Sequence, residues 1–148
     1  MAVILPPNTE LVATTYLRNI TQTMEPAPGV GTTLPEDTTS WADGFVQIVV
    51  VGGSPDVYVP VRQPLIQVDV WVPTKGTKPR WSFANSIAEY ILGFLYDTEN
   101  TQMLLSLGNY KDALVQVAYP VSEPRRVSND PAGYARYTFD VALTWTTP

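Results

Sequence analysis

The closing stretch of the chain, YARYTFDVALTW, carries a long strict alternation that constrains the fold strongly. Apolar side chains occupy every second position, and the positions between them are mostly polar. The apolar set is Ala135, Tyr137, Phe139, Val141, Leu143 and Trp145. One dry face and one wet face are typical of an antiparallel sheet with helices on one side. We therefore predict a strand here, with the apolar set in the core.

A second alternating stretch, PLIQVDVWVP, runs from Pro64 to Pro73. One of its faces is wholly apolar and β-branched, which predicts a strand with that face buried. That face consists of Ile66, Val68, Val70 and Val72. The opposite face mixes apolar and polar side chains, namely Leu65, Gln67, Asp69 and Trp71. Either this mixed face contacts water, or it contacts another chain.

The remaining elements follow from periodicity and from turn residues. Residues 8–20 and 80–96 carry apolar positions at steps of three and four, which predicts two helices. Residues 45–53 form a near-continuous apolar run, which favours a central strand, and residues 113–119 predict another strand. Residues 97–107 are interpreted as a short further turn of helix.

Two prolines and a long irregular segment interrupt this pattern. Pro60 and Pro64 favour an edge position or a bulge at the start of the second alternating strand. Residues 21–44 are rich in proline, glycine and threonine and show little periodicity. A structureless loop of this length is uncommon in a compact domain unless it is functional, so either a surface loop or a partner-binding arm is expected.

Together these elements predict one domain over residues 1–148 with an α+β fold. We expect a roughly four-stranded, mainly antiparallel sheet with two helices packed on one face. The expected order is α-β-β-α-β-β, with a flexible arm or loop at about 21–44 after the first helix.

The chain contains no cysteine and no histidine. These absences remove thiolate chemistry, the two commonest metal ligands and the usual general base near neutral pH. We therefore expect that the chain is not an enzyme and that it has no catalytic residue, no metal and no cofactor. Asp69 and Asp140 are the only carboxylates on predicted strands, and we interpret both as solvated surface groups.

Charge and hydropathy limit the partners. The formal net charge is −5, and residues 1–60 hold six acidic residues against the single basic Arg18. No basic patch interleaved with aromatics is present, so tight binding to nucleic acid is not expected. The N-terminus lacks the basic region and long apolar stretch of a secretory signal, and no segment approaches a membrane span. We expect a soluble protein made in the cytoplasm.

Six residues are candidates for a subunit or partner interface. Leu65 and Trp71 lie on the mixed face, and Trp41 is a lone indole in a polar segment, although packing on its own domain is favoured for it. Tyr58 and the pair Arg125–Arg126 complete the set. An arginine pair in a polar loop can bind a phosphate or a partner carboxylate, but it is more often solvated.

The order of elements, together with PLIQVDVW, WSFANSIAEYILGFL and GYARYTFDVALTW, resembles the tail terminator (tail completion) proteins of long-tailed bacteriophages. The resemblance covers most of residues 8–146 and lies in topology and strand style, with no catalytic signature. It implies a virion protein of the tail–neck region that is made in the host cytoplasm and forms a ring, typically of six copies. Such a ring caps the head-proximal end of the tail tube and offers a surface for head–tail joining.

The implied partners are further copies of this chain, the tail tube protein and a head-completion or connector protein. DNA passes through the lumen of such a ring without tight binding, which an acidic protein tolerates. Two alternatives remain open. One is another neck component, such as a head-closure or connector protein. The other is a monomeric carbohydrate- or protein-binding module, in which Trp41, Tyr58 or Trp71 forms an exposed platform.

Overall fold

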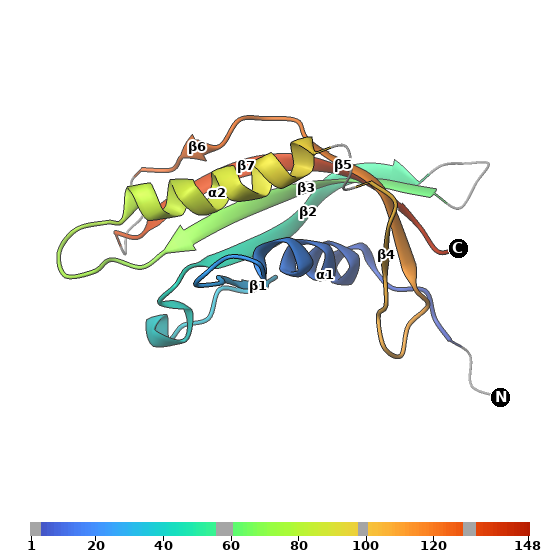
Figure 1. The fold of residues 1–148 in the computed structure, drawn as a ribbon, viewed down its shortest axis with the longest axis horizontal. Helices are drawn as coiled ribbons and strands as arrows, with labels where there is room; N and C mark the ends of the chain where they lie inside the picture. The colour runs from blue at the N-terminus through green and yellow to red at the C-terminus, as the bar shows by residue number, and fades with distance from the viewer. Residues whose placement is uncertain (1–3, 56–60, 98–100, 129–132) are drawn as a thin grey trace.

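Two α-helices cover one face of a seven-stranded mixed sheet that curls into about half a barrel (Figure 1). The computed structural model describes residues 4–55, 61–97, 101–128 and 133–148. The helices are α1 (Thr9–Thr21), the short 3-10 helix η1 (Thr38–Trp41) and α2 (Trp81–Tyr96). The strands are β1 (Gly29–Gly31), β2 (Phe45–Pro55), β3 (Val61–Val72), β4 (Met103–Leu105), β5 (Ala113–Pro120), β6 (Arg125–Arg126) and β7 (Ala135–Thr146).

The strand order is β1-β2-β3-β7-β5-β4, and β6 pairs with β7 beyond the end of β5. Only the pair β1–β2 is parallel among the described strands. The long strands β2, β3, β7 and β5 form the antiparallel centre of the sheet. None of the described helices is long and apolar enough to span a membrane.

The predicted fold of roughly four strands in the order α-β-β-α-β-β is wrong. The four long strands are present, but β1, β4 and β6 enlarge the sheet to seven strands. These three additions have only two or three residues each, too few to show a period in the sequence. Residues 97–107, interpreted as a turn of helix, contain the edge strand β4 instead.

The places of β2 and β3 in the sheet also differ from expectation. The apolar β2 was expected at the centre, yet only Phe45–Gln47 pair with β1 on its outer side. For the proline-flanked β3, an edge position or a bulge at its start was expected, and the strand lies between β2 and β7 rather than at an edge. A bulge does occur opposite Leu65, between Val50 and Gly52 of β2. The places of β2 and β3 in the sheet were therefore determined more by their pairing partners than by their apolar content.

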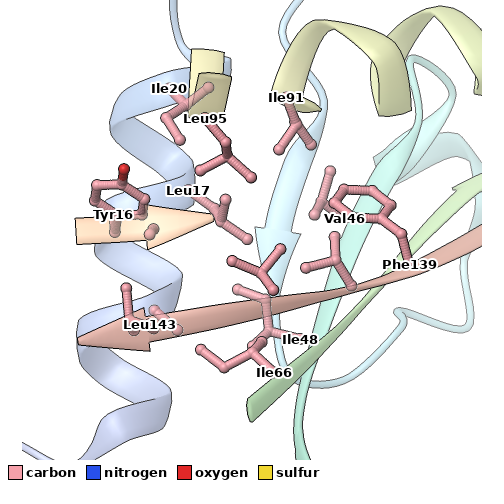
Figure 2. Close-up of a cluster of buried hydrophobic side chains, with 14 of the residues drawn as sticks. Tyr16, Leu17, Ile20, Val46, Ile48, Ile66, Ile91, Leu95, Phe139 and Leu143 are labelled. Atoms are coloured by element: carbon pink, nitrogen blue, oxygen red, sulfur yellow. The ribbon is translucent and has the colours of Figure 1, made fainter. Parts of the chain in front are cut away.

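The core lies between the two helices and the sheet (Figure 2). The sheet contributes the apolar alternation of β7, with Phe139 fully buried, and the β-branched face of β3. The α1 stripe runs through Tyr16, Leu17 and Ile20. Burial raises the pKa of Tyr16 to about 12, so its phenol stays neutral well above physiological pH. The side of the sheet away from the helices is called the open face below.

The helix starts are fixed by different means. Asn8 caps α1, because its Oδ1 accepts a hydrogen bond of 2.8 Å from the amide of Leu11. No side chain caps α2, which begins after Arg80. The Arg80 guanidinium instead donates to the carbonyls of Ala42 and Pro73, at 2.7 and 3.2 Å. The bond to Ala42 ties the start of α2 to the segment that precedes β2, and the bond to Pro73 ties it to the end of β3.

The segment between α1 and β2 is folded onto the domain. It contains β1 and η1, and its Trp41 is only 3% exposed. The Trp41 indole donates to the carbonyl of Pro35 at 3.0 Å and meets the Tyr134 ring edge-on, with centroids 5.2 Å apart. Farther along α2, the hydroxyls of Thr23 and Tyr90 are hydrogen-bonded. That residues 21–44 are flexible in an isolated subunit stays a prediction.

Candidate interaction surface

The open face has a polar part built around Asp69. This residue was interpreted as solvated, but it is only 2% exposed. The Arg136 guanidinium forms an ion pair with it, with 3.2 Å between Nη2 and Oδ2. The amide nitrogen of Gln67 donates to the same carboxylate at 3.0 Å. A carboxylate removed from water is stable only with such partners, so these groups are coupled.

Trp71 covers this group of side chains. Its indole Nε1 donates to Oε1 of Gln47 at 3.0 Å, and the Arg136 guanidinium lies 4.6 Å above its ring centroid. Arginine over an indole face is a favourable cation–π arrangement. We call this set, with Gln47, Gln67, Asp69, Trp71 and Arg136, the Asp69 network. Contacts within a single chain therefore account for Gln67, Asp69 and Trp71 of the mixed face.

The other part of the open face is apolar. Strand register places its side chains in a diagonal row that crosses β2, β3, β7, β5 and β4. Leu65 lies opposite Ala142, which lies opposite Tyr119, and Leu114 lies opposite Leu104. We call this row the apolar belt; its members are Val49, Leu65, Leu104, Leu114, Val117, Tyr119 and Ala142.

Several belt side chains are well exposed to solvent. Leu104 is 59% exposed, Tyr119 51%, Val49 38% and Val117 36%. Cross-strand and diagonal neighbours in a sheet are close enough for their side chains to touch, so these residues form one surface. A contiguous exposed apolar surface, as distinct from scattered apolar residues, indicates an interaction site. Leu65 therefore shares a surface with residues from four other strands.

The structure places the six predicted interface residues in different settings. Leu65 belongs to the apolar belt, whereas Trp71 is half-buried in the Asp69 network. Trp41 is buried against its own domain. Arg125 and Arg126 are exposed on β6, and the Arg126 guanidinium lies 3.9 Å from the Trp81 ring centroid. Tyr58 lies outside the described residues.

Sequence reasoning did not select most of the belt. Val117 and Tyr119 lie after a bulge that shifts the register of β5 against β7, between Val115 and Val117. Such a bulge hides the alternation that marks an outward face. Leu104 was assigned to a helix and so was not considered for a sheet face. Tyr119, a large aromatic side chain next to Pro120 at a strand end, was a signal visible in the sequence.

No group of three or more metal-ligating side chains occurs among the residues that the structure describes. A scan against protein-family models found no matching family, and a search of curated proteins found no match. The apolar belt and the Asp69 network are therefore the structural features to which a function can be assigned.

Proposed function

We propose that this chain is a structural protein of a bacteriophage virion that assembles into a homo-oligomeric ring. As the resemblance to tail terminator proteins implies, the ring caps the head-proximal end of the tail tube and provides the surface for head–tail joining. The observation that carries the proposal is the apolar belt on the open face. We assign the belt to the contact with the tail tube.

Two further features support this assignment. The Asp69 network holds the polar part of the open face in a fixed arrangement beside the belt, so the surface is organised before any partner binds. The net charge of −5 suits a ring through which DNA passes, because an acidic protein does not retain the duplex. The platform of a monomeric binding module has less support, since Trp41 is buried and Trp71 is half-buried.

A tube built by stacking identical rings has no intrinsic end, because each added ring recreates the surface that accepted it. A ring with two unlike faces can occupy that surface without regenerating it. We therefore expect that a phage lacking this protein makes DNA-filled heads and separate tails that do not join. Its tail tubes should often exceed the normal length. Electron microscopy of the lysate measures both effects.

The nearer alternative, a head-closure protein, predicts a different lysate. Its loss leaves heads that leak DNA beside tails of normal length. Adding the purified protein to correctly sized, uncapped tails should restore joining if it is a terminator. Leaking heads together with normal, joinable tails would contradict the terminator proposal and favour the head-closure role.

A further inference from the structure

The β2 strand has an unpaired outer edge next to the apolar belt. Only Phe45–Gln47 pair with β1, and no other described strand pairs with residues 48–53 on that side. The sequence of this edge is IVVVGG, with no charged residue and no proline. Natural proteins usually block such an edge with lysine, proline or a covering element, because its free backbone groups accept another strand.

A hollow lies over the β2–β3 pair near the end of this edge. A cavity of about 310 Å³ is lined by Thr9 at the start of α1, by Val50, Gly52 and Gly53 of β2, and by Arg62 to Pro64 of β3. Gly53 adopts a φ of +96°, and a Cβ there would collide with the backbone of β3, so glycine is required at this position. Gly52 and Gly53 leave this end of the edge without side chains, and a Cβ at Gly52 would meet nothing within 4 Å, so another chain can approach the backbone there.

The opposite edge of the same sheet is β4, the last strand in the order. Its central residue, Leu104, is 59% exposed and lies on the same open face as Val49 of β2. The β4 strand also carries no charge. The apolar belt therefore runs across the sheet from one uncharged edge to the other.

We propose that the ring forms by strand addition, in which the β2 edge of one copy pairs with the β4 edge of the next. The inference rests on the proposed ring, since a head-to-tail ring needs two different surfaces on every subunit. Pairing the edges brings Val49 of one copy beside Leu104 of its neighbour. It satisfies backbone groups on both strands and joins the belts into a continuous apolar band.

The absence of cysteine in the natural chain allows a clean cross-linking test. Val49→Cys and Leu104→Cys are combined in one variant and treated with a short bis-maleimide. Within one chain the two sites are four strand spacings apart along the sheet, each about 4.8 Å, so a short reagent favours links between copies. We expect a ladder of linked species that ends in one closed ring. The variant that pairs Val49→Cys with Tyr96→Cys, on the exposed end of α2, is the control and should give no ladder.

The single-cysteine variants show whether the contact between neighbouring copies is head-to-tail. Val49→Cys alone and Leu104→Cys alone should remain unlinked, because a head-to-tail joint never places a residue beside its own copy. A linked dimer from Val49→Cys alone would mean that two β2 edges meet, which overturns the inference. Oligomers with the mass of a ring, detected by light scattering without any cross-linked ladder, would also overturn the strand-addition inference. They would leave the proposed function intact. A protein that forms no ring and binds no tube end would contradict both.

Discussion

Replacing Arg136 with leucine is expected to lower the free energy of unfolding by about 3 kcal/mol, because it leaves the buried Asp69 carboxylate without its counter-ion. Among the residues that the structure describes, Gln67 then remains as a side-chain donor to that carboxylate. Because the Arg136 side chain is 27% exposed, water gains some access after its loss, which keeps the effect at the lower end for buried pairs. Urea denaturation followed by circular dichroism measures the change.

Two further variants separate the ion pair from general effects of losing an arginine. Arg125→Leu removes an exposed guanidinium on β6 and should change stability by less than about 0.5 kcal/mol. The double variant Asp69→Asn with Arg136→Leu removes both charges and should regain most of the lost stability. If Arg136→Leu matches Arg125→Leu, or if the double variant is no better than the single one, the Asp69 network is not coupled as described.

Replacing Tyr119 with lysine is expected to weaken the capping of tail tubes while leaving the fold and the ring intact. Tyr119 is 51% exposed in the middle of the apolar belt, so its replacement costs the isolated subunit little. At an apolar contact, lysine carries a charge that must be desolvated. We expect binding to tube ends to weaken about tenfold or more, which corresponds to about 1.4 kcal/mol. Co-sedimentation with uncapped tubes measures the binding.

Tyr96→Lys is the matched control for this change. Tyr96 is 62% exposed and is the last residue of α2, which packs on the side of the sheet opposite to the belt. The same substitution there should leave tube binding unchanged. Equal binding by the two variants would remove the belt from the tube contact. Trp71→Glu is a poorer test, because Trp71 also supports the Asp69 network.

The sequence predicted those parts of the fold that have a long period. The alternation of β7 and β3 and the stripes of α1 and α2 are visible in the chain, and these elements supply the core. The short strands were not predictable in the same way. The β1 strand is a Gly-Val-Gly triplet and β6 is an arginine pair, so both exist only because a longer strand lies beside them. Such short strands form through pairing in the tertiary structure, and no local sequence pattern indicates them.

The candidate site was predictable only in part, for a related reason. The mixed face of β3 was visible from alternation, and Leu65 does lie on the apolar belt. Trp71 looked equally free in the sequence, because its partners Gln47 and Arg136 lie 24 and 65 positions away along the chain. Tyr119 and Val117 join Leu65 only through the registers of β5 and β3 on β7, and a bulge shifts the register of β5.

The most direct test of the proposed function is an image of the purified protein mixed with uncapped tail tubes. The account predicts a ring at one end of each tube, and tubes carrying that ring should not lengthen when more tube protein is added. Protein that stays dispersed beside bare tubes, or that binds DNA-filled heads and ignores the tubes, would contradict it.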